Sequence, residues 1–169
     1  MNKNNKVVLK LMTEKGYEFL KSILKYKKLI SFVVIGRDKN VDEDFSEIIS
    51  NLCIGSKIPY FYRGSEPKID EEIFVMAVSW RWLINHPVKK LIVFHDSLLP
   101  KYRGFSPLVN MLINGEKEIG VSAIFGSKEY DRGEIISQES TLISYPIKIK
   151  YGIFGWVCKF EENGVIPDI

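Results

Sequence analysis

Short apolar runs recur along the chain and are rich in β-branched and aromatic residues. Such runs predict strands that are buried on both faces, as parallel strands are. We place them at residues 7–12, 29–35, 72–79 and 91–94, with a further short strand at 60–62.

Two segments between these runs carry apolar residues at helical spacing, residues 16–26 and 42–52. Strands that alternate with helices in this way predict βαβ units and a mostly parallel sheet. Parallel strands end at one common edge, which is where open α/β sheets bind their ligands. The fold class is therefore α/β, with a Rossmann-like sheet flanked by helices.

The pattern changes in the last third of the chain. Residues 107–114 predict a short helix, and residues 119–125 and 134–139 alternate like half-exposed strands that pair antiparallel. The tail, residues 147–160, is predicted as a helix, although Gly152 and Gly155 disfavour it. We expect one domain over residues 1–169, with an antiparallel addition near its C-terminal end.

Composition narrows the class of protein. A hydrophobic content of 46% indicates a globular chain, and a net charge of +3 gives no argument for nucleic acid. No apolar run approaches the roughly 20 residues of a membrane helix. Cys53 and Cys158 have no spacing for a metal, and their apolar neighbours predict buried thiols. A cytoplasmic protein without a metal is expected.

The first strand is followed by Thr13-Glu14-Lys15-Gly16. A dinucleotide-binding fold has a glycine-rich loop here, which lets backbone N–H groups approach phosphates. Its absence argues against a nicotinamide-dependent dehydrogenase, and makes a plain nucleotide-binding module a weak alternative.

The stretch FHDSLLPKYRG, residues 94–104, follows the strand at 91–94 and carries His95. A titratable cluster at the end of a buried strand is a candidate active site. An imidazole there can accept a proton from an attacking amine or polarise a carbonyl oxygen. The alternative is a core histidine held by one hydrogen bond.

With INGEKEIGV (residues 113–121) and YDRGEIISQ (residues 130–138), this stretch resembles the folate-dependent formyltransferase family. The resemblance implies a Rossmann-like formyltransferase fold. It also implies transfer of a formyl group from 10-formyltetrahydrofolate to a primary amine. In the family, the histidine that corresponds to His95 handles the proton, and Asp131 maps onto the catalytic aspartate. Asp131 could instead be a turn residue, and Arg132 could neutralise it.

The chain departs from the family at Val93, where relatives have an asparagine that donates to the formyl oxygen. Loss of such a donor typically costs about 10²–10³ in rate. A backbone N–H, the Ser97 hydroxyl, Asn110 or Asn114 could replace it. Otherwise the reaction is slow, or the domain binds folate without catalysis, or it hydrolyses formyl-folate.

The resemblance also implies which residues form the two substrate sites. The folate would lie against Ser79, Trp80, Arg81, Trp82, Leu83, Leu99, Glu129 and Tyr130. The acceptor would lie against Ser97, Lys101, Tyr102, Arg103 and Gly104. A flat heterocycle needs this mixture of apolar walls and polar groups. A packing role for the tryptophans and a surface role for the charged residues are the alternatives.

KYRG, residues 101–104, resembles the methionyl-tRNA and amino-sugar branches of the family rather than the glycinamide ribonucleotide branch. The tRNA branch would carry a basic insertion and a second, basic domain, neither of which is expected here. The acceptor is therefore predicted to be an amine on a nucleotide-linked sugar. We expect the C-terminal region of many relatives to be missing or vestigial here, so that a partner chain in a homodimer completes the acceptor site.

Overall fold

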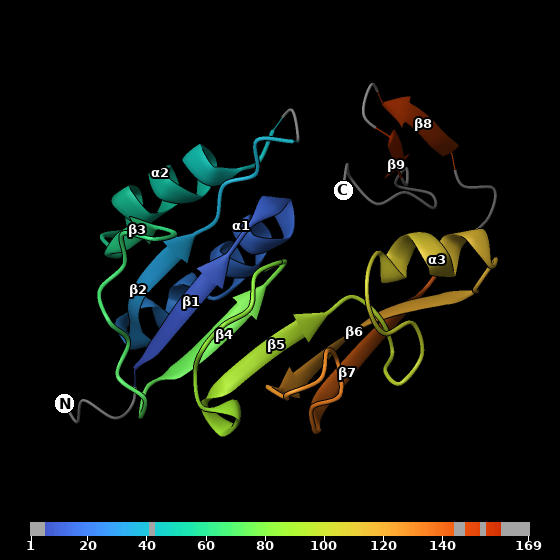
Figure 1. The fold of residues 1–169 in the computed structure, drawn as a ribbon. Helices are drawn as coiled ribbons and strands as arrows, with labels where there is room; N and C mark the ends of the chain where they lie inside the picture. The colour runs from blue at the N-terminus through green and yellow to red at the C-terminus, as the bar shows by residue number, and fades with distance from the viewer. Residues whose placement is uncertain (1–5, 41–42, 144–147, 153–154, 160–169) are drawn as a thin grey trace.

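The computed structural model describes residues 6–40, 43–143, 148–152 and 155–159. Within these residues a seven-stranded sheet has the order β3-β2-β1-β4-β5-β6-β7 (Figure 1). The first five strands are parallel, and β6 and β7 are antiparallel additions. The strands are β1 (Val7–Leu11), β2 (Ile30–Ile35), β3 (Tyr60–Tyr62), β4 (Phe74–Val78), β5 (Leu91–His95), β6 (Glu118–Phe125) and β7 (Ile135–Leu142). The predicted mostly parallel sheet with its antiparallel addition is confirmed.

One face of the sheet is covered by α1 (Thr13–Ser22) and α2 (Ser46–Ser56) (Figure 1). Alternate residues of β1, such as Leu9 and Leu11, point to this face and are fully buried. Leu20 of α1 packs in the same cluster, which forms the main core. A further helix, α3 (Pro107–Ile113), precedes β6.

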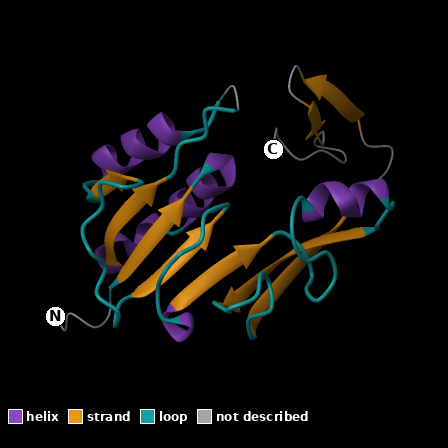
Figure 2. Ribbon diagram, viewed as in Figure 1, coloured by secondary structure: helices purple, strands orange, loops and turns teal. Residues whose placement is uncertain are grey.

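Loops, rather than α-helices, cover the opposite face of the parallel strands. Val8, Val34, Val75 and Leu91 form a second buried cluster there. The described connections from β3 to β4 and from β4 to β5 contain only one 3₁₀ turn, Val88–Lys90 (Figure 2). Parallel sheets normally carry helices on both faces. A thinner cover on this face leaves room for a cavity beside the strands.

The prediction for the tail is wrong. The structure has a hairpin of β8 (Lys148–Gly152) and β9 (Gly155–Lys159), not a helix. Gly152 pairs with Gly155 at the end of the ladder, and glycine at both positions disfavours the interior of a helix. The remaining residues of the predicted helix, 147, 153–154 and 160, lie outside the described residues.

Helix α2 begins at Ser46, later than predicted, and extends to Ser56. Cys53 on its inner side is fully buried, as predicted, and burial raises the pKa of its thiol to about 12. The side chain of Cys158 lies outside the described residues. In the described part of the chain, every helix is too short or too polar to cross a membrane.

The β6–β7 connection packs closely at Gly133. A Cβ on this glycine would overlap the carbonyl group of Phe125 on β6. We therefore expect Gly133→Ala to lower the free energy of unfolding by about 1–3 kcal/mol, the usual cost of overpacking. Urea unfolding measures the change.

Gly55→Ala is the matched control, because a Cβ at this helical position would meet no atom within 4 Å. It should raise the free energy of unfolding by about 0.5 kcal/mol through helix propensity. Equal stability of the two variants would contradict the close packing at Gly133.

Candidate active site

His95 is the last residue of β5 and lies at the carboxyl edge of the parallel strands. The structure brings it together with Asp131, although 36 positions separate them (131 minus 95). The Nδ1 atom of His95 lies 3.4 Å from Oδ1 of Asp131, and the side chains are 9% and 15% exposed. A shielded imidazole–carboxylate pair is suited to moving a proton.

The second ring nitrogen of His95 fixes how the imidazole is oriented. Nε2 lies 2.9 Å from the carbonyl oxygen of Tyr102. A carbonyl oxygen only accepts, so Nε2 carries a hydrogen and donates it. Nδ1 is then the nitrogen that faces the carboxylate. Tyr102, predicted to contact the acceptor, thus contributes to the site through its main chain.

Asp131 is held by the loop that follows β5. Its Oδ2 atom accepts a hydrogen bond from the backbone N–H of Gly104 at 2.9 Å, and the Arg103 side chain donates to its carbonyl oxygen at 3.0 Å. Asp131 has φ +53°, a left-handed conformation that an aspartate tolerates in tight loops. Arg132 does not neutralise the carboxylate, since it pairs with Glu129 at 2.8 Å.

The segment that carries Asp131 runs back along β5. At its start, the backbone N–H of Gly126 donates to Leu91, the first residue of β5. At Asp131 it contacts His95, the last residue of the same strand. The segment therefore spans the length of β5 and adds a wall to the sheet face that His95 shares with Val93.

A buried network, which the sequence did not predict, holds the turn between His95 and Tyr102. Ser122 Oγ donates to the carbonyl oxygen of Ser97 at 2.6 Å and accepts from the backbone N–H of Leu99 at 3.0 Å. Gln138 Nε2 donates both to Ser122 Oγ and to the carbonyl oxygen of Leu99, at 2.8 and 2.9 Å. Buried polar groups of this kind are normally satisfied, and the network fixes where Tyr102 lies.

Ser97 is fully buried, and its hydroxyl donates to the carbonyl oxygen of Lys101 at 2.8 Å. Ser97 therefore has no exposed surface for the predicted contact with the acceptor. The hydrogen of its hydroxyl group is already donated to the carbonyl oxygen of Lys101. Leu99 is likewise 5% exposed, so it supports the turn rather than facing an open folate site.

The two asparagines considered as replacement donors lie on or just after α3. Asn110 donates to carbonyl oxygens at the start of α3, and Asn114 donates to the hydroxyl of Tyr102. Val93 itself packs against the second buried cluster and offers no donor. Among the described residues, none of these side chains therefore takes the place of the asparagine that the family has.

Ionic and aromatic contacts hold the segment after β4 in place. Arg81 pairs with Asp38, a buried residue beyond the end of β2, at 2.6 Å. The rings of Trp80 and Trp82 are edge to face, with centroids 5.1 Å apart. Arg63 lies over Trp82 at 4.2 Å. The predicted folate segment is thus held by contacts with the segments that follow β2 and β3.

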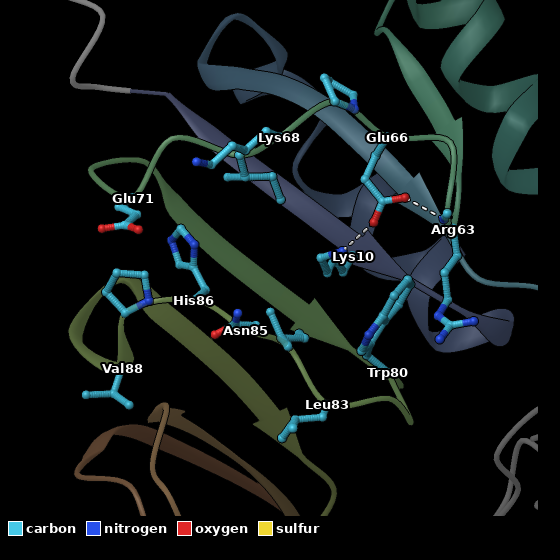
Figure 3. Close-up of a pocket in the computed structure, with 15 residues that line it drawn as sticks. Lys10, Arg63, Glu66, Lys68, Glu71, Trp80, Leu83, Asn85, His86 and Val88 are labelled. Carbon is cyan, nitrogen blue, oxygen red and sulfur yellow. Dashed lines mark hydrogen bonds and ion pairs between the residues drawn. The ribbon is translucent and has the colours of Figure 1, made fainter.

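A cavity of about 1010 Å³ lies on the loop-covered face of the sheet (Figure 3). Trp80, Leu83 and Ile84 of the segment after β4 line one part of it. Lys10 and Glu66 also line it, whereas His95 and Asp131 do not. The cavity therefore includes part of the predicted folate site and not the imidazole–carboxylate pair.

The other predicted contacts lie at the surface. Glu129 and Tyr130 are exposed, and Lys101 has a 71% exposed side chain. Among the described residues, no group of three or more His, Cys, Asp or Glu could hold a metal ion.

The fold is that of solved formyltransferases. A sugar 3-N-formyltransferase, WlaRD, has a TM-score of 0.63 at 23% identity, covering 84% of this chain and 53% of that one. The N-formyltransferase of Helicobacter canadensis also has a TM-score of 0.63, at 21% identity, covering 82% and 53%. These likenesses define the class, a Rossmann-like formyltransferase fold.

The sequence comparisons agree with this class. Residues 76–147 match the family model described as formyl transferase. The bifunctional polymyxin resistance protein ArnA of Wigglesworthia glossinidia brevipalpis is 31% identical over 153 residues, 82% of this chain and 23% of that protein. The methionyl-tRNA formyltransferase of Lactobacillus johnsonii is 30% identical over 147 residues, 82% of this chain and 46% of that protein. The matched part of the chain is thus similar to formyl transferases, and the chain spans less than half the length of both of these relatives.

Ser122→Ala tests the buried network beneath the turn. Removing the hydroxyl leaves the backbone N–H of Leu99 buried without its acceptor, so the free energy of unfolding should fall by about 1–3 kcal/mol. Urea unfolding measures the loss. Ser140→Ala, on exposed β7, is the matched control and should change stability by less than about 0.5 kcal/mol. Equal losses would show that the network does not hold the turn.

Proposed function

We propose that this protein transfers the formyl group of 10-formyltetrahydrofolate to a primary amine. The observation that carries the proposal is the His95–Asp131 pair, held 3.4 Å apart at the carboxyl edge of the sheet. Both residues lie within the part of the chain that matches the formyl transferase family model.

The reaction requires one proton to move from the acceptor amine to the folate. The amine nitrogen adds to the formyl carbon and loses a proton, and the bond from that carbon to N10 of the folate then breaks as N10 is protonated. Asp131 and Nδ1 of His95 are placed to relay this proton. Tyr102 keeps Nε2 occupied, so the ring does not rotate during the transfer.

The proposed donor site is the part of the cavity lined by Trp80, Leu83 and Ile84 (Figure 3). Apolar walls with a few polar groups suit a flat pterin ring. The Arg81–Asp38 ion pair holds this segment, so the wall is formed before the ligand arrives. Leu83, which is 83% exposed, would be covered by the bound folate.

The proposed acceptor is an amine on a nucleotide-linked sugar. The structures with this fold support that class, since one was solved with dTDP and 5-N-formyltetrahydrofolate and another with folinic acid and dTDP-3-aminofucose. The Lys101 side chain is 71% exposed and lies 3.9 Å from Glu116, and its ammonium is proposed to pair with the diphosphate. A second copy of the chain is proposed to complete this side of the site.

His95→Ala should lower kcat by at least about 10²-fold, because proton transfer by a positioned side chain contributes about 10²–10⁴-fold. The assay follows formylation of a dTDP-linked amino sugar by 10-formyltetrahydrofolate, and circular dichroism confirms folding. Asp131→Asn should show a similar loss. Glu134→Gln, the same change of charge three positions away in an exposed ion pair with Lys89, should retain activity.

Unchanged turnover in folded His95→Ala would refute the assignment of this histidine. Release of formate by the unaltered protein without any amine would instead identify a formyl-folate hydrolase. Binding of folate with neither reaction would identify a binding domain.

Val93→Asn tests the departure from the family. Val93 shares its sheet face with His95, so an asparagine there would place an amide beside the imidazole. We expect kcat to rise by about 10²–10³-fold, the usual contribution of one donor to a developing oxyanion. Val93→Leu, which adds no donor, is the control. A folded Val93→Asn variant with unchanged kcat would show that another group already donates to the formyl oxygen.

A further inference from the structure

Tyr102 has a backbone conformation that a large side chain rarely adopts. Its φ angle is +55°, in the left-handed region, where the Cβ of an L-residue lies too close to a carbonyl oxygen. Bulky residues in this region are outliers, and such outliers gather at functional sites when the surrounding structure holds them. The carbonyl oxygen of this same residue accepts the hydrogen of His95 Nε2 at 2.9 Å. The unusual backbone and the contact with the candidate active site therefore coincide at one residue.

The side chain of Tyr102 is tied to the connection between α3 and β6. Its hydroxyl donates to Oε1 of Glu116 at 2.7 Å and accepts from Nδ2 of Asn114 at 3.1 Å. The hydrogen bond to the Glu116 carboxylate raises the pKa of the Tyr102 phenol above its ordinary value. The phenol therefore stays protonated and remains a donor to Glu116.

Glu116 is a fixed anchor because α3 ends in a Schellman motif. The backbone N–H of Glu116 donates to the carbonyl oxygen of Met111 at 3.0 Å, and that of Gly115 donates to Leu112 at 3.1 Å. Gly115 has φ +65°, the left-handed conformation on which the motif depends. Met111 is 3% exposed, so the motif is joined to buried structure. The position of the Glu116 backbone is thus set by α3 rather than by the loop that contains Tyr102.

Tyr102 lies between two parts of the loop that are held by other hydrogen bonds. Before it, the Ser97 hydroxyl donates to the carbonyl oxygen of Lys101 at 2.8 Å. After it, the backbone N–H of Gly104 donates to Asp131 at 2.9 Å. These bonds fix the path of the loop, whereas the backbone angles of Tyr102 itself determine where its carbonyl oxygen points. The phenol contacts stabilise the conformation in which this oxygen faces the imidazole, and they offset the steric cost of the left-handed backbone.

The direction of this carbonyl group decides which nitrogen of the imidazole can accept a proton. While the Tyr102 carbonyl takes the hydrogen of Nε2, the neutral ring of His95 has an unprotonated Nδ1. Without that acceptor, the Asp131 carboxylate, 3.4 Å from Nδ1, favours the tautomer with its hydrogen on Nδ1. In that tautomer Nδ1 cannot take a proton from an attacking amine.

We propose that Glu116 is a positioning residue for His95 and acts through the phenol and the carbonyl oxygen of Tyr102. Asn114 supports the same phenol by donating to its hydroxyl. The inference rests on the proposed function, in which Nδ1 of His95 takes part in moving the proton. The alternative is a structural tie that holds the loop and leaves the tautomer of the ring unaffected.

Nitrogen-15 NMR of the histidine rings tests the inference without any need for turnover. The chain has two histidines, His95 and His86, and the His95→Ala variant assigns their signals. When the ring is neutral, His95 of the unaltered protein should carry its hydrogen on Nε2. Tyr102→Phe and Glu116→Ala should both shift the ring toward the tautomer with its hydrogen on Nδ1. His86, whose Nε2 lies 2.8 Å from the carbonyl oxygen of Ile73, should keep its signals in both variants.

Kinetics then connect the tautomer with the reaction. Tyr102→Phe and Glu116→Ala should each lower kcat by about tenfold, the contribution of one hydrogen bond to a charged group, and leave KM for the acceptor unchanged. The double variant should be no slower than either single variant, since both remove the same contact. Glu116→Gln should restore most of the activity lost in Glu116→Ala, because its amide oxygen still accepts from the phenol. Tyr26→Phe, the same change at a tyrosine that is 54% exposed, is the matched control and should leave kcat unchanged.

An unchanged His95 tautomer in folded Tyr102→Phe would overturn the proposal, whatever happens to kcat. A higher KM with unchanged kcat would also overturn it, since the phenol would then contact the acceptor directly. Transfer that is insensitive to Tyr102→Phe would refute this inference and leave the proposed function standing. A protein that transfers no formyl group but shows the tautomer shift would do the reverse. Urea unfolding verifies that each variant is folded.

Discussion

The imidazole of His95 is held between two oxygen atoms, and the site depends on this arrangement. The Tyr102 carbonyl takes the hydrogen of one nitrogen, and the Asp131 carboxylate faces the other. Neither oxygen belongs to the strand that carries the histidine. The geometry therefore requires the turn after β5 and the segment after β6 to dock on each other.

Two sets of hydrogen bonds provide that docking. The buried hydroxyl of Ser122 ties the turn to β6, and Gln138 ties it to β7. Gly104 then binds the carboxylate of Asp131. Ser122 is fully buried, so water competes poorly for its hydrogen bonds, and the antiparallel addition becomes part of the candidate site rather than only an extension of the sheet.

The loop-covered face has a different role. Without helices over β1 and β4, the sheet has a cavity on this side, and its wall combines Trp80 with the Lys10–Glu66 pair. A helix would have filled this volume with apolar side chains. The thin cover therefore leaves a cavity next to the segment after β4.

The sequence by itself determined the main parts of this protein. Apolar runs and their spacing predicted the parallel strands, and they placed His95 at a strand end, because burial and strand geometry are local properties of the pattern. The tail was not predicted correctly, since β8 and β9 are stabilised by pairing with each other rather than by local propensity.

Only the tertiary structure decided which polar residues act together. Ser97 looked available in the sequence and proved buried, while Ser122 and Gln138 gave no local signal and proved central to the turn. The pairing of Lys10 with Glu66 joins residues 56 positions apart. Hydrogen bonds and ion pairs between distant segments depend on how the chain is packed, and no local periodicity encodes them.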